Sequence, residues 1–219
     1  MLPSLIALLA ALLVGVLLYW LVFRPRFLRW GATDEEVRRP LPGDEFLPSD
    51  PKLNATHAIT INTAAAHVWP WLVQMGQNRG GFYSYTWLEN LIGCRIRNAD
   101  RIVPEWQSLE VGDHVILHPK TPPLPVIALE PGRLLTLKGW GSFYLRQIDE
   151  RTTRLVIRSR AVYEPDIKNF YLRCSIGCRY IEMVHFIMER KMLLGIKQRA
   201  EATASQTAAT RPVRRVSKD

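Results

Sequence analysis

The sequence has few of the residues and motifs that mark common enzyme centres. It holds three cysteines among 219 residues, an odd number with no Cys-x-x-Cys pair, which argues against a disulfide framework and a zinc site. No Gly-x-Ser-x-Gly elbow, His-Glu-x-x-His pair or Gly-Lys-Ser/Thr phosphate loop occurs. The sequence therefore predicts no metal site and no cofactor.

Negative charge is also scarce. The 29 Lys and Arg residues outnumber the 20 Asp and Glu residues, and the net charge of +9 favours anionic partners such as lipid headgroups or nucleic acid. A basic strand face near the C-terminal half carries Arg154, Arg158 and Arg160 without interleaved aromatic residues. Because binding of single-stranded nucleic acid requires such rings, we expect this face to be solvated and expect no nucleic-acid partner.

One long segment lacks charge altogether. Residues 5–23 would form a helix of about 28 Å, close to the hydrocarbon thickness of a bilayer, with Tyr19 and Trp20 near one end. Arg24 and further arginines follow the segment and no basic residue precedes it. The charge bias predicts a retained single-pass anchor, residues 1–24, with the domain facing the cytoplasm. A cleaved signal followed by an exported domain is the alternative.

The region after the anchor, residues 25–53, is predicted to be a juxtamembrane linker, because Pro40, Pro42, Pro48 and Pro51 interrupt any helix. Within it, Thr33 followed by three acidic residues is typical of a helix start.

Hydrophobic periodicity predicts the remaining elements. Strands are expected at 54–61, 114–117, 126–130 and 134–140, a hairpin at 141–149 and 153–163, and helices at 64–75, 83–92 and 166–198. This order predicts an α+β domain over residues 54–199, with a curved antiparallel sheet wrapped around one long C-terminal helix and two short helices after the first strand. Residues 200–219 are predicted to be a disordered basic tail.

Aromatic, charged and amide side chains are densest between Met75 and Trp106. Rings that supply area and a few polar groups that supply orientation are typical of a small-molecule pocket. The predicted ligand-binding residues are Met75, Arg79, Phe82, Tyr83, Tyr85, Trp87, Asn98, Asp100, Trp106 and, from a later strand, Trp140.

Several runs carry a family resemblance. Residues 58–62 together with 68–76 resemble the opening of the SRPBCC superfamily, also called START-like or Bet v 1-like. Residues 30–33, 39–44, 79–85, 87–90 and 98–106 are similar to a mainly bacterial branch of it that has no agreed catalytic set. The resemblance covers roughly residues 30–198 and leaves the anchor outside. It implies a helix-grip fold with a deep apolar cavity for lipids, sterols or polyketides.

Two functions remain open from the sequence. The favoured one is a membrane-tethered module that binds a hydrophobic small molecule between the sheet and the C-terminal helix. The alternative is a cyclase- or hydrolase-like enzyme in which Asp100 or Glu89 is the general base and Arg101 or Arg79 stabilises an oxyanion. Protein partners are not indicated, and the membrane is expected to be contacted through residues 5–23.

Overall fold

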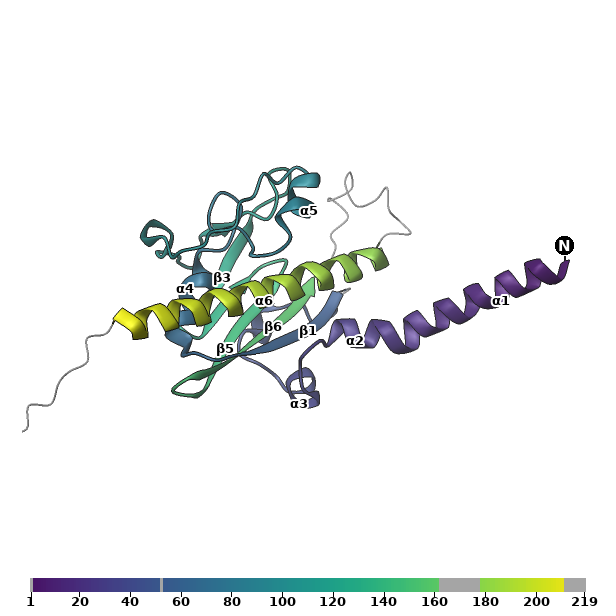
Figure 1. Ribbon diagram of the computed structural model, residues 1–219, viewed down its shortest axis with the longest axis horizontal. Coiled ribbons are helices and arrows are strands. Elements are labelled where there is room, and N and C mark those ends of the chain that lie inside the picture. Colours follow the sequence, from purple (N-terminus) through teal and green to yellow (C-terminus); the bar gives the residue numbers. More distant parts are fainter. Residues whose placement is uncertain (1, 52, 162–177, 211–219) are drawn as a thin grey trace, which may run out of the picture.

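The computed structural model describes residues 2–51, 53–161 and 178–210, and it has the α+β helix-grip architecture that the sequence predicts (Figure 1). A curved antiparallel sheet of six strands carries one long helix, α6, across its concave face. The strand order is β1-β6-β5-β4-β3-β2, so β1 and β2 form the edges. The strands are β1 Leu53–Ile61, β2 His114–Val115, β3 Leu124–Glu130, β4 Leu134–Leu137, β5 Gly141–Asp149 and β6 Thr152–Ala161.

Short helices and turns connect the strands. The N-terminal helix consists of α1 Leu2–Leu18, a π-helical turn Tyr19–Phe23 and α2 Arg24–Leu28. Further elements are α3 Asp34–Arg38, α4 Ala65–Val73, α5 Thr86–Leu91, α6 Cys178–Thr210 and the 3-10 turns Asp44–Phe46 and Pro104–Trp106.

The main core lies between the concave face of the sheet and α6. Alternation along β6 turns Leu155 and Ile157 toward this face, where α4 adds Trp71 and α6 adds Met192 and Ile196, all at most 1% exposed. Because these side chains fill the space beneath α6, they fix the helix across the sheet.

α6 differs from its predicted range. Its first described residue is Cys178, so the predicted helical positions Phe170, Cys174 and Gly177 lie outside the described residues. Beyond residue 198 the helix continues to Thr210, and Ala200 is fully buried. The prediction of a disordered tail is therefore wrong for residues 200–210. Alanine favours the helix strongly. The hydroxyls of Thr203, Ser205 and Thr207 donate hydrogen bonds to the backbone carbonyls four residues earlier, so they do not interrupt the helix.

The convex face of the sheet is covered rather than solvated. Arg158, predicted to be solvent-exposed, is 3% exposed and donates to Asp44 and to the carbonyls of Glu36 and Arg39. Arg154 makes a two-point ion pair with Glu36, at 2.9 and 2.8 Å. The prediction of a solvated basic face is wrong because the linker folds back over these arginines.

α3 shows how the linker is shaped for this contact. The Thr33 hydroxyl accepts the Glu36 N–H, and the Glu36 carboxylate accepts the Thr33 N–H, which is a complete capping box. Burial opposes ionisation of Glu36, yet hydrogen bonds from Arg154 and Thr33 hold the pKa of its carboxyl below the usual value. The helix start predicted from the sequence is confirmed.

The chain passes from the concave to the convex face around the edge of β1. Leu28 packs with Leu53 and Ala55 on the concave side, whereas Leu41 packs with Ala58 on the other. Between them, the Trp30 carbonyl accepts the Ala58 N–H at 3.1 Å, which occupies a hydrogen-bonding position on the open edge.

Gly31 makes this crossing possible. Its φ is +71°, and a Cβ atom would lie 2.1 Å from the carbonyl oxygen of Ala58. We predict that Gly31→Ala lowers the free energy of unfolding by about 3 kcal/mol or more, because main-chain overlap adds to the left-handed conformation. The measurement is urea unfolding of the full chain in detergent.

Gly93→Ala is the matched control. Gly93 has φ +95° but nothing within 4 Å of the added Cβ atom, so it should cost only the conformational part, about 1–2 kcal/mol. Equal losses for the two variants would contradict the role assigned to the edge contact.

Candidate functional site

An aromatic wall lines the concave side of the sheet. The ring of Trp140 lies 5.9 Å from Phe82 and 5.1 Å from Phe143, both in edge-to-face geometry. The indole N–H of Trp140 is buried and has no hydrogen-bond acceptor among the described residues. A buried donor without an acceptor is uncommon in folded proteins, so this N–H is a candidate contact for a polar ligand atom.

A buried acid with two imidazoles lies on the same side. Glu189 of α6 is 2% exposed and contacts His185 of α6, while its two oxygens accept from the Ser159 hydroxyl at 3.1 Å. His57 of β1 is 1% exposed and places Nδ1 3.6 Å from the Glu189 carboxylate. The cluster therefore joins β1, β6 and α6 through one carboxylate.

The charges of this cluster depend on one another. Burial alone would raise the pKa of Glu189, but the neighbouring imidazoles of His185 and His57 hold that pKa far below its usual range. Burial opposes protonation of His57, yet the Glu189 carboxylate and the Phe27 carbonyl raise its pKa. We infer that protonated His57 and ionised Glu189 form a charged pair, in which each partner stabilises the ionised form of the other.

The N-terminal helix docks beside this cluster. Nε and Nη2 of Arg24 donate to the carboxylate of Glu182 at 2.7 and 2.8 Å. The ring of Phe27 stacks on Phe186 with 4.9 Å between centroids. Nε2 of His57 lies 2.7 Å from the Phe27 carbonyl oxygen. Residues 4–28 are long and apolar enough to cross a membrane, and these contacts fix their C-terminal end to β1 and α6.

Several predicted ligand-binding residues have structural contacts. Tyr83 is 1% exposed, has φ +57°, and its N–H donates to Oδ1 of Asn98 at 2.8 Å. The amide of Asn98 donates to the Ser84 carbonyl and the Thr86 hydroxyl, both at 3.0 Å. Arg79 donates to the Trp106 carbonyl at 2.6 Å. These hydrogen bonds fix the conformation of the irregular loop between α4 and β2.

The other predicted residues are spread between core and surface. Met75 and Phe82 are buried, Tyr85 and Trp106 are partly buried, and Trp87 is 67% exposed. Asp100 and Arg101 are exposed. The structure therefore brings Phe82 together with Trp140, and Tyr83 with Asn98, but it does not bring all ten residues into one pocket. Their binding role stays a prediction.

Glu89 differs from the other candidate bases. Its side chain is buried, one carboxylate oxygen has no hydrogen-bond partner among the described residues, and burial raises its pKa to about 7. A carboxyl with such a pKa can exchange a proton near neutral pH, which is what a general base requires.

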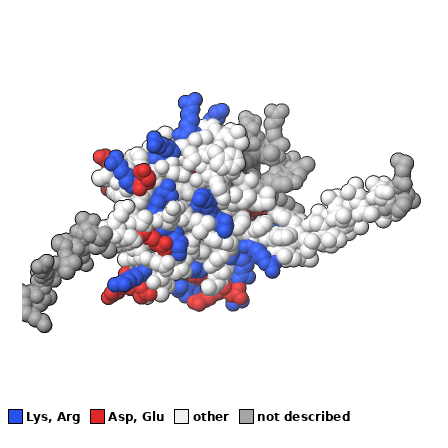
Figure 2. Space-filling model, viewed as in Figure 1, with Lys and Arg blue, Asp and Glu red and all other residues white. Residues whose placement is uncertain are grey.

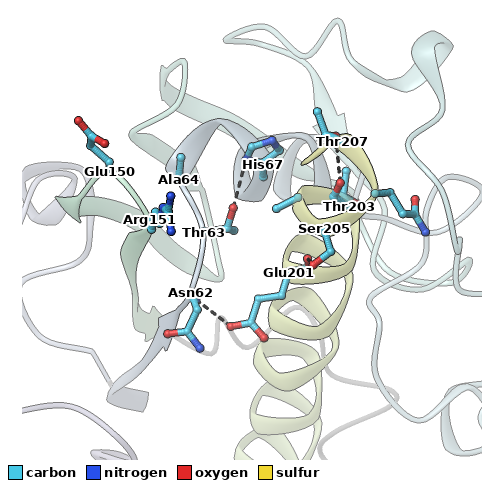
Figure 3. A pocket seen from close by; sticks show the side chains of 12 residues that line it. Asn62, Thr63, Ala64, His67, Glu150, Arg151, Glu201, Thr203, Ser205 and Thr207 are labelled. Carbon is cyan, nitrogen blue, oxygen red and sulfur yellow. Dashed lines mark hydrogen bonds between the residues drawn. The ribbon is translucent and has the colours of Figure 1, made fainter. Parts of the chain in front are cut away.

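Two pockets in the described part of the chain lie outside the core between the sheet and α6. A groove of about 1330 Å³ runs between the start of α4, the β5–β6 turn and the C-terminal part of α6 (Figure 3). In it the Asn62 N–H donates to Glu201 at 2.7 Å, and His67 is 3.1 Å from the Thr63 hydroxyl. A smaller pocket of about 230 Å³ includes Asp100. Neither lies between the sheet and α6, where buried side chains fill the expected cavity.

The sequence analysis missed the cluster around Glu189. A weak signal was present, because Glu182, His185 and Glu189 recur at three- and four-residue steps beside the apolar stripe of α6. Charged residues at such positions are costly to bury unless they have partners. The partners come from β1 and from the anchor, which lie far away in the sequence.

We predict that stability falls as pH rises through the folded pKa of His57. Because this pKa is raised, His57 stabilises the fold below its unfolded pKa of about 6.5, and the contribution is lost at higher pH. Glu189, whose pKa is lowered, loses its contribution only under acidic conditions. Unfolding midpoints of the full chain from about pH 6 to 9 measure the slope.

His57→Gln should flatten this slope, because the variant removes the titrating imidazole. His67→Gln is the control, since His67 contacts the Thr63 hydroxyl in the groove and lies outside the Glu189 cluster, and the variant should keep the wild-type slope. An unchanged slope in His57→Gln would show that another group causes the pH dependence.

Comparison with known proteins gives a structural likeness. No protein-family model and no curated protein matches the chain. Among solved structures, the solution NMR structure of the Polyketide_cyc-like protein Cgl2372 from Corynebacterium glutamicum is similar at 12% identity, over 72% of this chain and 94% of that chain, with a TM-score of 0.39. The assignment to a helix-grip fold therefore rests on the sheet and α6 themselves, and membership of the SRPBCC superfamily stays a prediction.

Proposed function

We propose that this protein is a membrane-anchored binding module for a hydrophobic small molecule. The observation that carries the proposal is the docking of a membrane-length helix onto the concave side of the sheet, through Arg24–Glu182 and Phe27–Phe186. A binding face held at the end of an anchor receives its ligand from the bilayer rather than from water. The arginines after the anchor favour a domain that faces the cytoplasm.

The side chains of the concave side suit a ligand with a long apolar part and one polar group. Phe82, Trp140 and Phe143 offer ring surfaces, and the unpaired Trp140 N–H offers one donor. Met188 and Met192 of α6 border this side. Because methionine side chains are unbranched and adaptable, they are the groups that repack to admit a ligand into a closed interior.

The alternative is a cyclase- or hydrolase-like enzyme, and one observation favours it. Glu89 is a buried carboxyl with a pKa near 7, whereas Asp100, the other candidate base, is exposed. Arg79, a candidate oxyanion partner, is already bonded to the Trp106 carbonyl. Binding remains the better supported function because neither candidate oxyanion residue is held ready: Arg79 is bonded to the Trp106 carbonyl and Arg101 is exposed.

Native mass spectrometry of the full chain, released from mild detergent, tests the binding proposal. The wild-type chain should retain a hydrophobic species at one-to-one stoichiometry. Trp140→Phe should weaken retention about five-fold or more, because it keeps one aromatic ring but removes the indole N–H, whose hydrogen bond is worth about 1 kcal/mol, together with part of the ring surface.

Trp69→Phe is the matched control, since it makes the same change on a partly buried tryptophan of α4 outside the predicted ligand-binding residues, and it should retain the species as the wild type does. An empty wild-type chain, or equal losses in both variants, would contradict the proposal.

Glu89→Gln tests the basis of the alternative. Folding raises the pKa of Glu89 from about 4.3 to about 7, so the ionised carboxylate destabilises the folded state. This loss of stability grows as pH rises from about 4.3 to about 7 and stays constant above about pH 7. The variant should therefore be more stable than the wild type at pH 8, on the order of 2 kcal/mol, and similar at pH 4. Equal stability at both pH values would remove the observation that favours an enzyme.

A further inference from the structure

We propose that α5 and the neighbouring face of α6 form a second membrane contact, an apolar surface that rests in the interface of the bilayer. This inference rests on the proposed function, because it takes the N-terminal helix to be in the membrane. The surface consists of Trp87, Leu91, Ile92, Val184 and Ile187, which we call the interfacial patch.

The patch is a cluster, unlike the other exposed apolar side chains of the domain. Trp87, Leu91 and Ile92 are 67%, 75% and 51% exposed, and all three belong to one short helix and its end. Val184 and Ile187 are 48% and 39% exposed. Single exposed apolar residues are ordinary, but a contiguous group of large ones marks an interaction surface.

Contacts of the two residues just before α5 with α6 bring the two parts of the patch to the same side of the domain. The Ser84 hydroxyl donates to the Met188 carbonyl at 3.0 Å, and Lys191 lies over the Tyr85 ring at 5.7 Å. Residues four apart lie on the same face of a helix, so Val184 shares a face with Met188, and Ile187 with Lys191. Both therefore point to the side of α6 that borders the start of α5.

The anchor places the α6 part of this surface at the depth of the headgroups. Arg24 and Phe27, at the end of the membrane-length helix, contact Glu182 and Phe186. Ile187 follows Glu182 by five residues, which is about 8 Å along the helix axis. The headgroup layer on one side of a bilayer is about 5–8 Å thick. In Figure 1, α5 and the N-terminal end of α6 lie toward the end of the domain from which α1 projects.

The chemistry of the patch and its border fits an anionic lipid surface. Tryptophan is enriched at the boundary between headgroups and acyl chains. Figure 2 shows an uncharged surface over α5 with basic side chains at its upper rim. Arg95 and Arg97 follow Ile92 closely and are exposed. The Ile92 carbonyl contacts His118 at 2.9 Å, two residues before the exposed Lys120. Apolar centre and cationic border together distinguish a bilayer from an apolar protein partner.

The test compares two isoleucines of equal exposure. Ile92 is 51% exposed in the patch, and Ile148 is 52% exposed near the β5–β6 turn at the far side of the sheet. Ile92→Cys and Ile148→Cys are labelled with bimane in the full chain, reconstituted into vesicles of equal parts phosphatidylcholine and phosphatidylglycerol. The labelled wild-type chain corrects for its own cysteines, of which Cys94 is buried.

Quenching reports what surrounds each label. At position 92, lipids with a nitroxide high on the acyl chain should quench at least three-fold more than at position 148, and aqueous iodide should quench correspondingly less. Equal quenching at the two positions would overturn the inference. A label at 92 that is shielded from both quenchers would also overturn it, since a protein rather than lipid would then cover the patch.

Flotation with the same vesicles separates this inference from the proposed function. A chain that does not float contradicts the membrane anchor and with it both proposals. A chain that floats while the label at 92 remains open to iodide contradicts the interfacial patch alone. Thermal unfolding of both cysteine variants, at positions that are half-exposed, checks that neither substitution disturbs the fold.

Discussion

The arrangement of the described chain depends on two of the three arginines that β6 turns away from the core, Arg154 and Arg158. Arg154 and Arg158 hold the linker on the convex face through Glu36 and Asp44. Removing one partner of such a buried pair would leave the other charge without compensation, at a cost of about 3–5 kcal/mol. With the linker fixed there, the chain has to round the edge of β1, and this places α2 on the concave face.

A second charged cluster acts on the concave side of the sheet, at the neighbouring strand β1. His57 lies on the concave face of β1, where it contacts Glu189 of α6 and the Phe27 carbonyl of α2. β1 is thus bonded on the concave side by the anchor and bordered on the convex side by the linker that follows it. Two independent sets of contacts on β1 make the N-terminal helix and the domain a single unit, so the direction of this helix is fixed relative to the surfaces of the domain.

The regular elements were predictable because their signals are local. The alternation of Leu155 and Ile157 with arginines identified β6, and the capping residues around Thr33 identified α3. The environment of Arg158 was not predictable, since an arginine on the outer face of a strand gives the same period-two pattern whether water or another segment covers it. The packed interior was hidden for a similar reason: the cavity was inferred from the fold class, whereas volume depends on how individual side chains interlock.

The candidate site was predictable only in part, because composition does not distinguish a residue that orients a ligand from one that shapes a loop. Asn98 has the donors and acceptor of a ligand contact, but Tyr83, Ser84 and Thr86 use all of them. Gly195 of α6 allows this loop to approach the helix closely, since a Cβ atom there would lie 2.3 Å from the Tyr83 carbonyl oxygen. The polar groups between Met75 and Trp106 therefore hold an irregular loop against α6. The aromatic side chains of the loop, buried Phe82 and exposed Trp87, remain as the groups that can contact apolar molecules.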